Sequence, residues 1–254
     1  MQLISDLMNL VFEDATTFKK LVDGIAVLVS EAEFIINEKG LSLKATDPSQ
    51  ISLVDFMLPK SAFKEFEAED TKLGVDLNYL NQVMSRAKAK DALQLSVSDD
   101  NSKLKVTFAG SSLRSFIIPL VDISQGELPL PKIEFDSEVK IKASALQESF
   151  KDAALVSTHI ILSIESDSFV VKATSSKGNM KNIYTKKDDS VIAIKTGDET
   201  NAMFPLDYLS SIVKAASSDT EVTLGLKSNA PVQVAYTVGE GSLKYFLAPR
   251  IESD

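Results

Sequence analysis

The residue types that carry most protein chemistry are scarce in this chain. It contains no cysteine and a single histidine, His159, which excludes disulfides, thiol nucleophiles and metal sites built from cysteine or several histidines. A serine–histidine–aspartate triad would have to use His159. That residue lies where a strand is expected to begin, and a hydrogen-bonded or solvent-facing role is far commoner there than catalysis. No glycine-rich phosphate loop occurs among the ten glycines. We therefore expect no catalytic residue and no cofactor.

Two aspartate pairs, Asp99-Asp100 and Asp188-Asp189, resemble the paired carboxylates of an acid–base or metal site. Both fall in turn sequences, where aspartate is common because its side chain bonds the nearby backbone. Neither is accompanied by a second acidic motif that would complete a metal site. We expect turns at both places and no bound metal.

Hydrophobic periodicity predicts four helices. The first covers about residues 14–29 behind Asp14, a plausible N-cap, and the second starts near Asp76. The third begins behind Ser144, which has capping-box spacing to Gln147. The fourth follows Pro205, since proline suits the first turn of a helix. Two helices fall in each half of the chain.

Most of the remaining sequence alternates between apolar and polar residues, as half-buried antiparallel strands do. Residues 93–97 and 104–108 alternate around a turn, and so do residues 222–226 and 232–236. Each half is therefore expected to be a strand-rich sheet carrying two helices on one face, which is an α+β fold.

The second half repeats the first. The blocks 44–46, 77–80 and 112–116 match the blocks 172–174, 206–209 and 242–246 in the same order and at a nearly constant offset. A duplication explains this better than chance. At 254 residues the chain also exceeds the usual size of one domain.

The stretch between the halves is too broken for a helix or a central strand. It contains Pro129, Pro131 and Gly126, and it is expected to be an extended connector. We predict an N-terminal domain at 1–120, a connector at 121–134 and a C-terminal domain at 135–254.

Charge is distributed unevenly over these elements. The four predicted helical segments, at residues 14–29, 77–90, 144–156 and 206–216, carry +2 of a total of −9, which leaves −11 for the remainder. Charged residues on a helix are most often its solvated face. The alternative is that the helices face a polyanion while the acidic sheets face solvent. No signal peptide and no apolar run of about 18 residues is visible, so a soluble, intracellular protein without a membrane partner is expected.

Two stretches resemble a known family. They are residues 46–54 (Thr-Asp-Pro-Ser-Gln-Ile-Ser-Leu-Val) and 243–252 (Leu-Lys-Tyr-Phe-Leu-Ala-Pro-Arg-Ile-Glu). With the duplicated layout, they resemble the sliding clamps of archaea and eukaryotes, the proliferating cell nuclear antigen (PCNA) family, over essentially the whole chain. The resemblance implies a trimeric ring of six similar domains. Its helices would line a hole around duplex DNA, and a continuous sheet would form the outside.

The resemblance also implies three sets of site residues. The DNA-facing candidates are Lys19, Lys20, Arg86, Lys88, Lys151 and Lys214. The pocket for partner peptides would use Thr46, Ile51, Leu53, Leu128, Leu130, Pro131, Pro231, Phe246, Leu247, Ala248 and Pro249. The subunit interface would involve Arg114, Phe116 and Ile118 on one strand, and Met180 and Ile183 on another. Strand residues such as Ile51, Leu53, Phe246 and Leu247 are more commonly core residues, although Leu128 and Leu130 on the broken connector have little core to fill.

The function implied is a non-catalytic processivity factor for DNA replication and repair. It would bind double-stranded DNA topologically and without sequence preference. DNA polymerase, clamp loader, flap nuclease and DNA ligase would bind through clamp-binding peptides. A subunit that works only in a heterotrimeric ring remains an alternative, and a two-domain enzyme is a remote one. The location would be cytoplasmic for an archaeal protein, which the sequence favours, and nuclear for a eukaryotic one.

Overall fold

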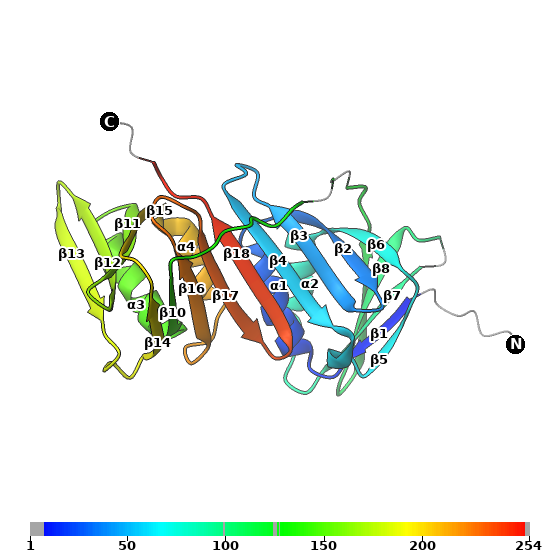
Figure 1. The fold of residues 1–254 in the computed structure, drawn as a ribbon. Helices are drawn as coiled ribbons and strands as arrows, with labels where there is room; N and C mark the ends of the chain where they lie inside the picture. The colour runs from blue at the N-terminus through cyan, green and yellow to red at the C-terminus, as the bar shows by residue number, and fades with distance from the viewer. Residues whose placement is uncertain (1–7, 99, 124–125, 127, 252–254) are drawn as a thin grey trace, which may run out of the picture. The chain divides into compact units, whose positions relative to one another are not determined.

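The computed structural model describes residues 8–98, 100–123, 126 and 128–251. The chain forms two compact units (Figure 1). The first contains Met1–Pro48, Val54–Leu128 and Val238–Leu243, and the second contains Ser49–Leu53, Pro129–Thr237 and Lys244–Asp254. Neither unit is one continuous stretch of the sequence. Strands β4 and β18, for example, each have residues in both units. The boundaries at 120 and 134 stay a prediction.

The first half of the chain supplies nine strands, two helices and one short 3-10 helix among the described residues. They are β1 (Met8–Phe12), α1 (Ala15–Ala26), β2 (Glu31–Asn37), β3 (Gly40–Thr46), β4 (Ser52–Pro59), η1 (Lys60–Ala62), β5 (Glu65–Ala68), β6 (Thr71–Asp76), α2 (Leu77–Met84), β7 (Ala92–Val97), β8 (Lys103–Ala109) and β9 (Leu113–Pro119).

The second half repeats this order without the 3-10 helix. Its elements are β10 (Ser137–Lys142), α3 (Ala143–Ala154), β11 (His159–Glu165), β12 (Ser168–Ser175), β13 (Gly178–Tyr184), β14 (Val191–Thr196), β15 (Thr200–Pro205), α4 (Leu206–Lys214), β16 (Glu221–Leu226), β17 (Val232–Val238) and β18 (Gly241–Leu247).

Strand pairing confirms the duplication. The first half contains the strand runs β5-β1-β7-β8-β9 and β4-β3-β2-β6, and the second contains β14-β10-β16-β17-β18 and β13-β12-β11-β15. Each run in one half corresponds, strand by strand, to a run in the other. Every described register is antiparallel, as the alternating pattern predicted. The period-two pattern did not reveal that each half divides its strands into two runs, because alternation fixes which face is buried but not which strands are neighbours.

Helix α1 begins behind its predicted cap, Asp14, and α2 begins directly after Asp76, near which its start was predicted. Asp14 accepts a hydrogen bond from Thr16 N at 2.9 Å, and Asp76 accepts one from Tyr79 N at 2.9 Å. Each carboxylate thus satisfies an amide that the first helical turn leaves without an intrahelical partner.

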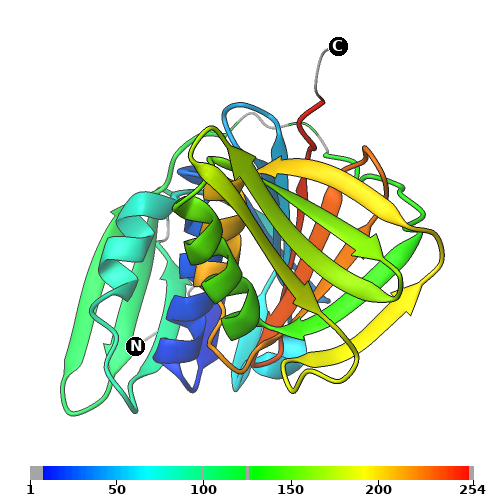
Figure 2. The same cartoon turned by 90° about the vertical axis from the view of Figure 1, so that its left-hand side faces the viewer.

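The capping box predicted for the third helix is wrong. Helix α3 starts two residues earlier, with Lys142 as the N-cap and no side-chain cap, so Ser144 lies inside the helix. The side-chain amide of Gln147 instead donates to two carbonyls at the C-terminal end of α4. They are the carbonyl of Val213, at 2.9 Å, and that of Ala216 just after the helix, at 3.0 Å. Tertiary contact with α4 thus takes the place of local capping, and α3 and α4 lie side by side (Figure 2).

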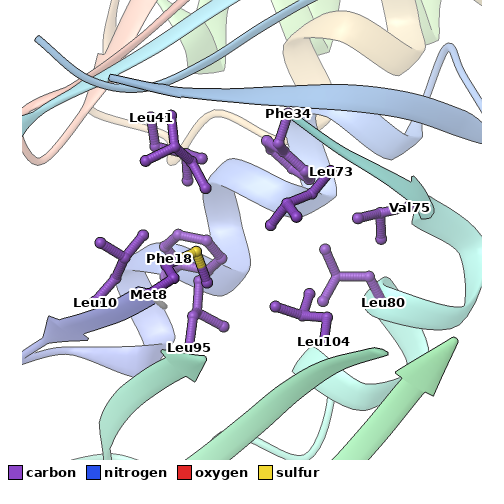
Figure 3. A pocket seen from close by; sticks show the side chains of 11 residues that line it. Met8, Leu10, Phe18, Phe34, Leu41, Leu73, Val75, Leu80, Leu95 and Leu104 are labelled. Atoms are coloured by element: carbon purple, nitrogen blue, oxygen red, sulfur yellow. The ribbon is translucent and has the colours of Figure 1, made fainter. Parts of the chain in front are cut away.

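The core of the first unit is formed jointly by its helices and by strands of both runs (Figure 3). Phe18 of α1 and Leu80 of α2 line an apolar cavity of about 20 Å³ together with residues from β1, β2, β3, β6, β7 and β8. Because this cavity is hardly larger than one water molecule, it is a packing defect and not a ligand site. Among the described residues, no helix has both the length and the apolar character needed to cross a membrane.

Candidate functional site

A cluster of exposed cations follows α2 and does not lie on it. Helix α2 ends at Met84, whereas Arg86, Lys88 and Lys90 occupy the loop before β7. As the structure bounds them, α1 carries +1, α3 carries −1, and α2 and α4 are neutral. The predicted positive balance of the helices is therefore wrong, because helical periodicity extended α2 by about two turns into this loop.

An ion pair fixes the loop that carries these cations. The Arg114 guanidinium of β9 bonds the Asp91 carboxylate and donates to the Arg86 carbonyl at 2.8 Å. Asp91 also accepts from Lys88 N at 2.8 Å. The guanidinium lies 5.2 Å from the centre of the Phe108 ring, a favourable cation–π distance. The loop is thus held at both ends of its basic segment.

The remaining DNA-facing candidates differ in how they are paired. Lys19 bonds Asp23 at 2.5 Å, and Lys151 bonds Glu148 at 2.6 Å, so each has an acid from its own helix beside it. Lys20 on α1 and Lys214 at the end of α4 are exposed. The carboxylates beside Lys19 and Lys151 reduce the attraction of these two lysines for a phosphate.

In the second unit, two of the predicted pocket residues, Ile51 and Ala248, meet at the C-terminal segment. After β18 ends at Leu247, Ala248 N donates to the Ile51 carbonyl at 2.8 Å and Arg250 N donates to the Met203 carbonyl at 2.7 Å. Ala248 and Pro249 are half-buried, as are Pro131 on the connector and Pro231 before β17. These backbone bonds fix the course of an apolar segment that remains partly accessible.

Burial corrects part of the predicted pocket. Leu247 is fully buried, and Phe246 and Leu53 are 6% and 9% exposed. Leu247 is therefore a core residue. Phe246 and Leu53 expose only a small part of their side chains to a partner peptide. Along β18 the residues 245–247 are all buried, a run in which both faces of the strand are covered and which alternation does not predict. Leu130 is half-buried, and the half-buried Thr46 and Leu128 belong to the first unit.

An open groove of about 620 Å³ adjoins the end of the connector in the second unit. Lys132, Ile133 and Glu134 line it together with Lys227 and Ala230. The Lys227 ammonium donates to the Glu134 carbonyl and to Asp136 Oδ1, both at 3.1 Å. This lysine ties the end of the connector to β16, and the described connector residues form no helix or strand, as expected.

The start of the connector is held in the first unit by a close backbone approach. Val121 N donates to the Gly74 carbonyl of β6 at 2.9 Å. A Cβ at position 74 would lie only 2.0 Å from the Val121 carbonyl oxygen, so only glycine fits there.

His159 joins the C-terminal segment through a contact that sequence reasoning missed. Arg250 Nη1 lies 3.0 Å from His159 Nε2 and 3.3 Å from Nδ1, and Thr158 Oγ1 lies 3.0 Å from Nδ1. Burial lowers the pKa of His159, and the Arg250 charge lowers it further, against an opposing effect of Asp207. Positions 159 and 250 are far apart in the sequence, and no local pattern links them. His159 starts β11 as predicted, and of the two roles left open, hydrogen-bonded or solvent-facing, the contacts show the first.

The two predicted interface strands are both terminal strands of their runs: β9 in the first unit and β13 in the second. Ile118 is fully buried, so its predicted interface role is wrong for the side chain. Arg114 turns inward to Asp91, and Phe116 packs edge-on against Phe108, leaving both partly exposed. The most exposed apolar residues of β9 are Leu113 and Ile117, at 74% and 60%.

On β13, Ile183 is 54% exposed and Met180 is half-buried. Unpaired backbone groups and exposed apolar side chains on a terminal strand favour pairing with another strand.

The described members of the aspartate pairs lie in turns or bends. Asp100 accepts from Ser98 Oγ at 2.6 Å and Ser102 Oγ at 2.8 Å, and the bond from Ser98 is the main cause that lowers its pKa to about 2. Asp188 accepts from Thr185 N, which lowers its pKa. Asp99 lies outside the described residues. No cluster of three potential metal ligands occurs in the part of the chain that the structure describes.

Comparison with known proteins identifies the fold. The family model described as proliferating cell nuclear antigen, N-terminal domain, matches residues 7–126, and the C-terminal domain model matches residues 129–251. The chain belongs to the proliferating cell nuclear antigen family. The resemblance carried by residues 46–54 and 243–252 is thereby confirmed.

Named relatives come from archaea. The chain is similar to the DNA polymerase sliding clamp of Pyrococcus furiosus, with 35% identity over 96% of this chain and 98% of the relative. It is also similar to that of Methanococcus maripaludis strain C5, with 34% identity over 93% and 96%.

Among solved structures, PCNA from Thermococcus kodakaraensis has a TM-score of 0.92 at 25% identity and covers 96% of this chain and 100% of that one. A. fulgidus PCNA, in a structure with the C-terminal region of FEN-1 bound, has a TM-score of 0.88 at 28% identity and covers 97% and 100%.

Proposed function

We propose that this protein is a DNA sliding clamp, a processivity factor that encircles duplex DNA and tethers the enzymes that work on it. The observation that carries the proposal is the family match over both halves of a duplicated fold, at residues 7–126 and 129–251. Relatives that share nearly the full length are named DNA polymerase sliding clamps. The clamp itself performs no catalysis. An archaeal relationship also supports a cytoplasmic location.

Duplex DNA is held by enclosure and by weak, diffuse contacts to phosphate. A clamp that slides must not read bases, and lysine and arginine on flexible stems contact phosphates without sequence preference. We assign this role first to Arg86 and Lys88 of the anchored loop and to the exposed Lys20 and Lys214. Lys19 and Lys151 contribute less, because Asp23 and Glu148 already pair with them.

Partner enzymes bind through a short peptide with apolar anchors. The half-buried segment Ala248-Pro249, with Leu130, Pro131 and Pro231, offers the accessible apolar surface that such anchors need. A flap nuclease is the partner with the most direct support, because A. fulgidus PCNA has been solved with the C-terminal region of FEN-1 bound. DNA polymerase, clamp loader and DNA ligase are proposed to use the same surface.

The ring is closed by three subunits, with β9 of one copy pairing with β13 of the next. Each of these strands ends its run, and both display exposed isoleucine. Because one chain carries both partners of a head-to-tail contact, copies of it can close a symmetric homotrimer. Light scattering should give three times the chain mass. A monomer at micromolar concentration would favour a heterotrimer instead.

The functional test is processive synthesis on a primed circular template with an archaeal replicative polymerase and clamp loader. We expect the protein to lengthen the DNA products that the polymerase makes per binding event. A quadruple variant with alanine at Lys20, Arg86, Lys88 and Lys214 should remain a trimer but lengthen the products less. Product lengths that do not change when the wild-type protein is added would contradict the proposal.

A further inference from the structure

The C-terminal segment next to the proposed peptide surface is held by a contact that depends on the state of one histidine. Arg250 makes two attachments to the second unit. Its backbone N–H donates to the Met203 carbonyl at 2.7 Å, and its side-chain Nη1 lies 3.0 Å from His159 Nε2. His159 is the first residue of β11, pairs in register with Pro205 and is half-buried. Pairing of β11 with β15 therefore fixes the position of His159, which contacts the Arg250 side chain.

This contact requires a neutral imidazole. A guanidinium can only donate hydrogen bonds, so the ring nitrogen that faces it must accept. The assignment that satisfies all three groups has Nδ1–H donating to Thr158 Oγ1 at 3.0 Å and Nε2 accepting from Arg250. Protonation of His159 places a hydrogen on Nε2. It removes the acceptor and sets two positive charges about 3 Å apart.

We propose that His159 is a positioning residue of the partner-peptide site: in its neutral form it holds Arg250, and with it Ala248 and Pro249, in the conformation that binds a peptide. The proposal rests on the proposed function, because it concerns the same peptide surface. Its consequence is that peptide affinity falls as the pH is lowered through the range in which histidine titrates.

The charged groups around the ring act in opposite directions. Arg250, from the C-terminal segment, disfavours the imidazolium, and Asp207, in the first turn of α4, favours it. Burial and Arg250 outweigh Asp207, so the pKa of His159 lies below its ordinary value of 6.5. A group with a lowered pKa binds fewer protons when Arg250 is in place. The docked segment is therefore stable above pH 6.5 and loses stability as the pH falls through and below that value.

The test is a titration of peptide affinity between pH 8.0 and pH 5.5 with the full-length protein. The probe is a synthetic clamp-binding peptide with one aliphatic and two aromatic anchors. It lacks histidine, is acetylated at its N-terminus and carries a rhodamine label for fluorescence anisotropy. For the wild type we expect about a three- to tenfold loss of affinity across this range, the size expected when one typical, partly solvated hydrogen bond is lost.

Two substitutions separate a titrating role from a merely structural one. His159→Gln retains a neutral acceptor at every pH, so we expect wild-type affinity at pH 8.0 and a flat profile. His159→Lys is charged throughout, so we expect the weak affinity of the acidic state already at pH 8.0. Arg250→Gln removes the opposing charge and should also flatten the profile.

Hydrogen exchange of the Arg250 amide, corrected for its intrinsic pH dependence, provides a second readout. It should speed up below pH 6.5 in the wild type and not in His159→Gln. A wild-type profile as flat as that of His159→Gln would overturn the proposal, and so would equal losses at all pH values in the Gln and Lys variants. If the wild type fails to bind the peptide at pH 8.0, the proposed function fails and not this inference.

Discussion

Removing the Asp91 carboxylate should destabilise the first unit far more than removing an exposed acid. In Asp91→Ala the Arg114 guanidinium loses its anionic partner and Lys88 N loses its acceptor. The side chains of Asp91 and Arg114 are only 5% and 21% exposed. Breaking a fully buried pair costs about 3–5 kcal/mol. Because Arg114 keeps some water, the Arg86 carbonyl and the Phe108 ring, we expect about 2–3 kcal/mol.

The measurement is urea denaturation at a fixed chain concentration, since subunit association contributes to apparent stability. The matched control is Glu148→Ala. It breaks the Lys151 pair, whose side chains are 68% and 71% exposed, and should cost no more than about 1 kcal/mol. Arg114→Leu combined with Asp91→Ala should recover part of the loss, because no uncompensated charge remains. If Asp91→Ala costs no more than Glu148→Ala, the pair does not anchor the basic loop.

Three further outcomes follow from surface exposure and charge. Ile117→Glu on β9 should convert the trimer to monomers, as measured by light scattering. Ile192→Glu, at a 42% exposed position on β14, should leave the trimer intact. Dissociation of both variants would exclude a specific role for β9. Leu130→Ala should weaken peptide binding by about 1–3 kcal/mol in calorimetry without changing the melting temperature, and an unchanged affinity would place the anchors elsewhere. The hydrogen bond from Lys172 is the main cause that lowers the pKa of Glu165 from 4.5 to about 2. The stabilising effect of this ion pair should be complete above pH 4.5 and decline as the pH falls towards 2. Lys172→Met should therefore reduce the difference in unfolding free energy between pH 6 and pH 3. An undiminished difference would show that the pair does not cause this pH dependence.

Local signals in the sequence were sufficient for the elements whose stability is mainly local. Asp14 caps α1 as predicted, and α2 starts at Asp76 as predicted, since the start of a helix is decided within about four residues. The repeated order of strands and helices likewise followed from periodicity and from matching blocks. Family resemblance supplied the candidate surfaces, which periodicity alone could not.

Apart from the predicted extension of α2 beyond Met84, which came from local periodicity, the failures involve contacts between distant parts of the chain. Gln147 has the spacing of a capping residue, but its side-chain amide donates to two carbonyls at the end of α4 instead of capping α3. Leu247 and Ile118 are buried because neighbouring elements cover their faces of β18 and β9. The contact between His159 and Arg250 joins residues 91 positions apart, and no spacing rule predicts such a pair.

The central claim, that the protein holds DNA by enclosing it, is tested most directly by cutting the DNA. The clamp is loaded onto nicked circular DNA with an archaeal clamp loader, washed at high salt and analysed by gel filtration before and after linearisation with a single-cutting nuclease. Enclosure predicts that the clamp stays on the circle at high salt, because counterions weaken only the phosphate contacts, and that it leaves once the DNA has free ends. Loss from intact circles as salt rises, or retention on linear DNA with open ends, would contradict enclosure and indicate ordinary electrostatic binding.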